Sequence, residues 1–192
     1  MSFFNMVNDD STVPMRRSFL GKSSLILSGA AVALLAGKDA LAAKGGESTE
    51  QDIRILNSAI GAELEAIAAY QVGAESGLLQ PAVLALAVTF QGHHKEHADV
   101  LSKTIVKLGG KAAVAKAKYN FPVETLKTQA DVLRFAASLE KGAVSAYLNA
   151  VPLFGNADLA KAAASILGDE AMHWAILRNA LGEVPVPSAF MS

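Results

Sequence analysis

The sequence contains no cysteine, and this absence excludes disulfide bonds, zinc–thiolate sites and iron–sulfur clusters. An excess of one charge is also lacking. The 17 basic and 18 acidic residues leave a net charge of −1, which gives no reason to expect a nucleic-acid partner. Alanine is frequent and runs of β-branched residues are few, so the composition favours helix. Any bound metal must be held by His, Asp and Glu side chains, which suit iron, manganese or zinc.

The first 42 residues have the pattern of an export signal. Arg16-Arg17-Ser18-Phe19-Leu20-Gly21-Lys22 resembles the twin-arginine motif, although Met15 replaces the usual Ser or Thr and Lys22 lies one place late. An apolar stretch, residues 23–37, and the small-x-small site Ala40-Leu41-Ala42 follow. A membrane anchor is the alternative, but this stretch spans only about 22 Å as a helix, short of the ~30 Å hydrocarbon core. We expect residues 1–42 to be a cleaved twin-arginine signal peptide, a periplasmic location, and membrane contact only during export.

The rest of the chain reads as one all-helical domain. We expect a linker over residues 43–50, a four-helix bundle over 51–182 and a C-terminal tail over 183–192. Ser48-x-x-Gln51 and Thr128-x-x-Asp131 resemble capping boxes, and Pro81 suits the first turn of a helix. Gly109-Gly110, Pro152 and Gly182 end helical patterns. These signals predict four helices with a connection of roughly 18 residues between the second and third: about 48–74, 81–108, 128–151 and 158–181.

Each predicted helix carries an apolar stripe that steps by three and four residues, as the inward face of a bundle does. Every stripe is apolar except near its middle, where an ionisable residue interrupts it. The interruptions are Glu63 in the first helix, His94 and His97 in the second, Glu140 in the third, and Glu170 and His173 in the fourth.

The two halves of the chain also repeat one another. Glu63 is followed seven residues later by Tyr70, and Glu140 seven residues later by Tyr147. The step from Glu63 to His97 is 34 residues and that from Glu140 to His173 is 33. Two helical hairpins related by a pseudo-two-fold axis would bring these groups to one level of the core.

Three carboxylates gathered in an apolar core repel one another, and each buried charge costs several kcal/mol unless it is compensated. No Lys or Arg lies on the inward stripes, so two divalent cations would be the natural compensation. Glu170 and His173, three residues apart, can close on one ion. His93 lies beside its stripe and is predicted to be a hydrogen-bonded structural residue, while Glu65 and Glu96 are predicted to be solvated.

The motifs resemble those of a known superfamily. The segment 63–70, Glu-Leu-Glu-Ala-Ile-Ala-Ala-Tyr, is similar to the first-helix motif of bacterioferritins. The segments 94–99 and 169–174 resemble the Glu-x-x-His segments of the second and fourth helices. The mature chain is similar over nearly its whole length to exported ferritin-like domain proteins of bacteria. The resemblance implies an all-α, ferritin-like antiparallel four-helix bundle with a long crossover between helices 2 and 3.

The resemblance also implies a di-metal centre, with two iron ions as the first expectation and manganese or zinc as alternatives. Its ligands would be Glu63, His94, His97, Glu140, Glu170 and His173, and Tyr70 and Tyr147 would orient carboxylates through their hydroxyls. His94 replaces the glutamate that di-iron ferritins have in the second helix. The site therefore has three carboxylates in place of four, and a single ion held by Glu140, Glu170 and His173 is a further alternative.

Three functions remain open from the sequence. The first is oxidation of Fe(II) with dioxygen or peroxide as acceptor. The second is a non-catalytic metal-binding protein, or a stress-protective or desiccation-related one, with the same fold. The third is a metal-free bundle held by Glu–His pairs and water. Only residues 182–192 follow the last predicted helix, so we expect a monomer or homodimer and not a storage cage.

Overall fold

The computed structural model describes residues 46–191, so the expected signal peptide lies outside the described residues. The described chain forms four α-helices: α2 (Gly46–Glu75), α3 (Pro81–Lys107), α4 (Gln129–Ala150) and α5 (Ala157–Ala180). Two short 3-10 turns, η1 (Val123–Thr125) and η2 (Val151–Leu153), precede α4 and α5. No strand occurs among residues 46–191. The predicted all-α class and four-helix count are confirmed.

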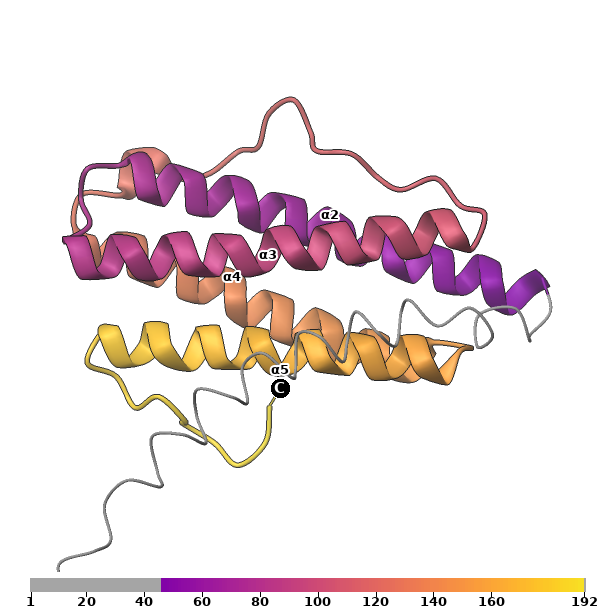
Figure 1. Ribbon diagram of the computed structural model, residues 1–192. Helices are drawn as coiled ribbons and strands as arrows, with labels where there is room; N and C mark the ends of the chain where they lie inside the picture. The colour runs from indigo at the N-terminus through magenta and orange to yellow at the C-terminus, as the bar shows by residue number, and fades with distance from the viewer. Residues whose placement is uncertain (1–45, 192) are drawn as a thin grey trace, which may run out of the picture.

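The helices pair as two antiparallel hairpins, α2 with α3 and α4 with α5 (Figure 1). The long connection between α3 and α4 returns the chain from one end of the bundle to the other, so α3 and α4 run in the same direction. This is the expected long crossover. It brings α2 against α4 as well, and the two hairpins close into one bundle.

Local sequence explains most of the helix ends. Thr128 caps α4 by accepting a hydrogen bond from the Asp131 backbone, and the Asp131 carboxylate accepts one from the Thr128 N–H, as predicted. Asn156 caps α5 through its side-chain oxygen, which accepts hydrogen bonds from the backbone N–H groups of Asp158 and Leu159. After α3, Gly109 adopts a positive φ of 84°, which lets Gly110 donate back to Ile105.

The predicted cap of the first helix is wrong. The described part of α2 already includes Gly46, inside the segment expected to be a linker, so Ser48 lies within the helix and is not its cap. Gln51 does not complete a capping box either: its side chain donates to the backbone oxygen of Leu153, 2.7 Å away in η2. Asp52 accepts hydrogen bonds from Gly155 and Asn156 in the following turn. These contacts hold the first turns of α2 against the turn between α4 and α5.

Two apolar clusters fill the bundle, one toward each end. One contains Leu56, Leu101 and Leu159, and the other contains Phe90 and Leu177. Each fully buried large apolar side chain contributes about 1.5–3 kcal/mol. Along every helix the ionisable residues lie between the two clusters, so they occupy a polar layer in an otherwise apolar core.

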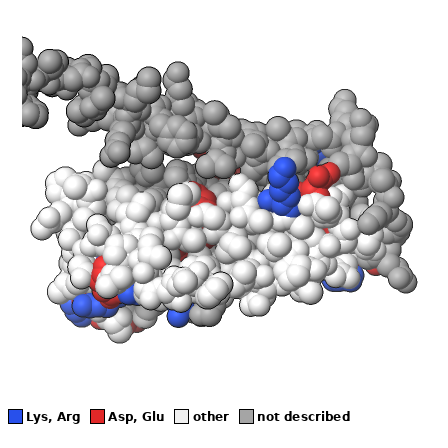
Figure 2. Space-filling model, turned by 90° about the horizontal axis from the view of Figure 1, so that it is seen from below, with Lys and Arg blue, Asp and Glu red and all other residues white. Residues whose placement is uncertain are grey.

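The outer surface is sparsely charged in places. Figure 2 shows a face on which the described residues are mostly uncharged, with the Lys, Arg, Asp and Glu side chains confined to a few spots. Met172 and Ile176, on the outer side of α5, are about half exposed. None of the described helices combines the length and apolar character needed to cross a bilayer.

Candidate metal centre

All six residues predicted as ligands meet in the middle of the bundle. Each helix contributes at least one: Glu63 from α2, His94 and His97 from α3, Glu140 from α4, and Glu170 and His173 from α5. Five of the six side chains are no more than 2% exposed, and that of His97 is 15% exposed. Their donor atoms fall into two groups that share His94 and Glu170, and within each group the atoms lie within 4.8 Å of one another.

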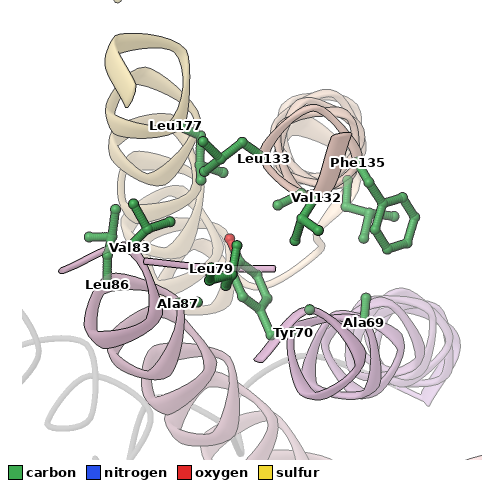
Figure 3. Close-up of a pocket in the computed structure, with 13 residues that line it drawn as sticks. Ala69, Tyr70, Leu79, Val83, Leu86, Ala87, Val132, Leu133, Phe135 and Leu177 are labelled. Atoms are coloured by element: carbon green, nitrogen blue, oxygen red, sulfur yellow. The ribbon is translucent and has the colours of Figure 1, made fainter. Parts of the chain in front are cut away.

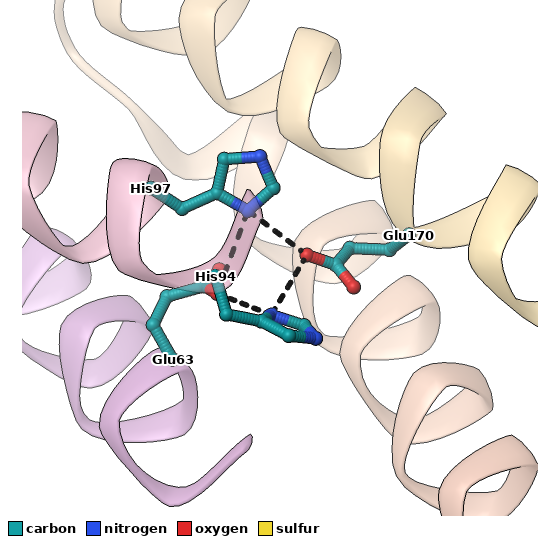
Figure 4. A group of neighbouring side chains, drawn as sticks. All are labelled: Glu63, His94, His97 and Glu170. Carbon is teal, nitrogen blue, oxygen red and sulfur yellow. Dashed lines mark hydrogen bonds and ion pairs between the residues drawn. The ribbon is translucent and has the colours of Figure 1, made fainter. Parts of the chain in front are cut away.

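The first group consists of Glu63, His94, His97 and Glu170 (Figure 4). His94 Nδ1 lies 2.8 Å from Glu63 Oε2. His97 Nδ1 lies 3.1 Å from Glu170 Oε1 and 3.5 Å from Glu63 Oε2. Two imidazoles and two carboxylates therefore face a common point between α2, α3 and α5.

The second group consists of His94, Glu140, Glu170 and His173. His94 Nε2 lies 3.3 Å from Glu140 Oε1, and His173 Nδ1 lies 3.5 Å from the same oxygen. Glu170 directs Oε2 toward His173 at 3.6 Å, while its Oε1 faces the first group. The Glu170 carboxylate is thus the one positioned between the two groups, as a bridging ligand would be.

Several buried nitrogen and oxygen atoms of these residues have no hydrogen-bond partner. They are His97 Nδ1, His173 Nδ1, Glu140 Oε2 and both oxygens of Glu170. A buried polar atom without a partner costs about 1–3 kcal/mol, and native proteins retain few of them. All five belong to residue types that bind divalent metals, and they converge on the same two points. The residues present therefore fit two metal ions held by oxygen and nitrogen ligands.

Two tyrosines hold the carboxylates from the opposite hairpin. Tyr147, on α4, donates to Glu63 Oε1 on α2 at 2.6 Å. Tyr70, on α2, donates to Glu140 Oε1 on α4 through a short hydrogen bond. The internal repeat predicted from the sequence thus appears as a reciprocal exchange, because each hairpin supplies a tyrosine to the other's glutamate. Burial raises the pKa of both hydroxyls well above 10, as do the neighbouring carboxylates, so both tyrosines remain donors.

The protonation states of the cluster are set by competition between burial and pairing. Burial alone would raise the pKa of Glu63, but the hydrogen bond to His94 and the nearby imidazole of His97 outweigh it and lower the pKa to about 2. Burial would lower the pKa of His94, yet hydrogen bonds to Glu140 and Glu63 raise it to about 11. Burial raises the pKa of Glu170. Without metal, therefore, protons on the imidazoles provide the positive charge that the carboxylates need.

Two residues that the sequence analysis did not assign to the site lie beside it. Asp169 Oδ2 is 3.4 Å from His97 Nε2 and 3.3 Å from His173 Nε2, so one carboxylate faces the outer nitrogens of both imidazoles. Such a carboxylate fixes the orientation of ligating histidines. The sequence carried a signal for Asp169, since it lies four residues before His173 and shares its helix face.

His93 is hydrogen-bonded, as predicted, and its partner is His173, one of the candidate metal ligands. Its Nδ1 lies 2.9 Å from His173 Nε2 and 3.2 Å from Asp169 Oδ2. Sequence reasoning set His93 aside because it is off the inward stripe of its helix. Of the two glutamates predicted to be solvated, Glu96 is exposed and Glu65 is half-buried, and neither joins the cluster.

An apolar pocket lies beside Tyr70, at the end of the bundle where a turn joins α2 to α3 (Figure 3). It has about 430 Å³ of empty space, part of it open to solvent. Val83, Ala87, Leu133 and Leu177 are among its lining residues, together with Tyr70. Tyr70 therefore lines the pocket and also donates to Glu140 through its hydroxyl.

Comparisons with known proteins agree with this fold. The family model described as "Ferritin-like domain" matches residues 51–183. The structure is similar to that of a conserved hypothetical protein from Mycobacterium tuberculosis, with a TM-score of 0.65 and 25% identity over 75% of this chain and 99% of that one. It is also similar in fold to "ferritin like, diiron-carboxylate proteins" from Bacillus anthracis strain Ames, with a TM-score of 0.62 and 18% identity over 71% and 99%. Among curated proteins, none matches the sequence.

Proposed function

We propose that this chain, which belongs to the ferritin-like domain family, is an exported protein that binds two metal ions, iron by preference, and oxidises Fe(II). The observation that carries this proposal is the set of five buried ligand atoms without a hydrogen-bond partner, from Glu140, Glu170, His97 and His173, in the polar layer of the bundle. Metal ions would satisfy these atoms, and iron bound there would supply one-electron chemistry toward an oxygen acceptor.

The ligand roles follow from the two groups. Glu63 and His97 would hold one ion, Glu140 and His173 the other, and Glu170 would bridge them, with His94 between both. Tyr147 holds Glu63 in place and Tyr70 holds Glu140. Asp169 orients the imidazoles of His97 and His173 through their outer nitrogens. These contacts hold the donor set in position before metal enters, which lowers the ordering cost of binding.

Dioxygen is the acceptor that the surroundings of the centre favour. The pocket beside Tyr70 is lined by apolar side chains, and an apolar lining suits small apolar molecules such as dioxygen. Peroxide needs hydrogen-bond partners that this lining does not offer. We infer that dioxygen approaches along the pocket and that Tyr70, which contacts Glu140, separates the pocket from the metal ligands.

A second function is favoured by one specific observation. His94 occupies a position between Glu63 and Glu140 and contributes no negative charge when it binds metal. Two divalent ions with three carboxylates retain one positive charge, and oxidation to the ferric state adds more. A centre that binds metal without turnover, in a stress-protective protein, is therefore the alternative.

The test combines metal analysis with oxygen consumption. Protein folded in the cytoplasm is expected to hold two iron ions per chain and to consume oxygen when Fe(II) is added. Glu170→Gln should lose most of the bound metal, whereas Glu96→Gln, an exposed site on α3, should retain it. Bound metal without oxygen consumption would favour the second function. Protein with no affinity for any divalent metal would favour a bundle held by Glu–His pairs alone.

A further inference from the structure

A second, outer cluster of metal-ligating groups lies next to the buried centre. The Asp169 carboxylate is surrounded by three imidazole nitrogens: His93 Nδ1 at 3.2 Å, His173 Nε2 at 3.3 Å and His97 Nε2 at 3.4 Å. Ligand atoms of His93, Asp169 and His173 lie within 4.8 Å of one another, close enough to hold one ion. Imidazole and carboxylate ligands together suit iron, manganese or zinc.

Two of these imidazoles face both clusters. His173 directs Nδ1 toward Glu140 and Glu170 in the buried centre and Nε2 toward Asp169. His97 is arranged in the same way, with Nδ1 toward Glu63 and Glu170 and Nε2 toward Asp169. The same ring can therefore offer one nitrogen to an ion on the outer side and the other nitrogen to an ion inside.

Exposure decreases steadily from the outer cluster to the centre. The side chain of His93 is 41% exposed, that of Asp169 24%, that of His97 15% and that of His173 2%, while Glu170 is fully buried. His93 and Asp169 are thus the metal-ligating groups of this path that solvent reaches first. Negative charge increases in the same direction, from one carboxylate at the outer cluster to three at the centre.

We propose that His93 and Asp169, with the outer nitrogen of His173, form an entry site that captures a divalent cation from solvent and passes it to the buried centre. This inference rests on the proposed function. The ion would exchange the outer nitrogen of His173 for its inner one as it moves toward Glu140 and Glu170. Because the inner site offers more carboxylates, transfer inward is favourable, and the entry site is occupied only in passing.

His93 offers a clean test because it is not one of the ligands of the buried centre and is partly exposed. Cobalt(II) serves as the probe, added without oxygen to metal-free protein and followed by its visible absorbance in a stopped-flow instrument. His93→Ala should slow cobalt uptake severalfold and leave the final number of bound ions unchanged. The control is Thr89→Ala, an exposed position one turn earlier on α3, which should load at the wild-type rate.

The remaining outcomes separate the two proposals. Unchanged uptake by His93→Ala would overturn the entry site. A lower final affinity with an unchanged rate would also overturn it, since His93 would then only hold His173 in position through their 2.9 Å contact. Wild-type protein that binds no cobalt would overturn the metal centre itself and the entry site with it.

Discussion

The hydroxyl of Tyr147 on α4 donates a hydrogen bond of 2.6 Å to Glu63 on α2, across the interface between the two hairpins. The bond ties a buried carboxylate to a helix 84 residues away in sequence. Tyr70 and Glu140 make the reciprocal bond in the other direction. Each glutamate of this pair is thus positioned by the hairpin to which it does not belong.

Tyr147→Phe removes this bond without changing the shape of the side chain. Hydrogen bonds to charged groups contribute about 1.5–3 kcal/mol, so we expect metal-free protein to lose about that much free energy of unfolding. Metal affinity should fall about tenfold, because the carboxylate is no longer held in place. Denaturant unfolding and metal titration measure the two effects. Tyr119→Phe, in the crossover, is the control, and equal losses in both variants would contradict the assigned role.

His94→Glu restores the fourth carboxylate that the sequence lacks relative to di-iron ferritins. Without metal, the variant loses the hydrogen bonds of His94 to Glu63 and Glu140 and adds a like charge, so its melting temperature should fall by several degrees. With two divalent ions bound, the fourth carboxylate brings the net charge of the ions and carboxylates to zero. Fe(II) oxidation should then be faster than in the wild type. A variant that is slower and no less stable without metal would contradict this account of the substitution.

Ala87→Leu adds apolar volume to the pocket beside Tyr70. If dioxygen reaches the centre through this space, oxidation by dioxygen should slow severalfold, while oxidation by hydrogen peroxide should not change. Ala85→Leu, an exposed position on the same helix, is the control. Initial rates with each oxidant provide the measurement, and equal slowing with both oxidants would exclude the pocket as a dioxygen path.

Asp131 makes the stability of α4 depend on pH. A hydrogen bond from the Thr128 side chain and a backbone N–H bond from Lys127 hold the pKa of this carboxyl below 3.8. A group whose pKa is lowered in the folded state stabilises it above the unfolded pKa, and that stability disappears as pH falls through the folded pKa. Asp131→Asn should therefore lower the melting temperature at pH 7, and the difference from wild type should vanish in acid. Thermal melts across this range test the capping box, and a pH-independent difference would count against it.

Periodicity predicted the parts of this molecule that depend on one helix at a time. Inward stripes with a polar interruption identified Glu63, Glu140 and Glu170, and the repeat in their spacing anticipated the pseudo-two-fold arrangement. These predictions succeed because a residue's face on a helix follows from its number alone.

Features that depend on how two helices approach each other were not predictable in this way. The helix face of Asp169 follows from its spacing to His173, but its contact with His97 on another helix does not, and His93 reaches the site from beside its stripe. Gln51 does not take its predicted capping role, since it and Asp52 bind the distant turn between α4 and α5. Contacts of this kind appear only once the two hairpins are assembled.

The most direct test of the central claim is a crystal structure of protein soaked with Fe(II) without oxygen, with anomalous scattering recorded at the iron edge. We predict two anomalous peaks per chain, one among Glu63, His97 and Glu170 and the other among Glu140, Glu170 and His173. Iron absent from the polar layer, or bound only at the molecular surface, would contradict the account.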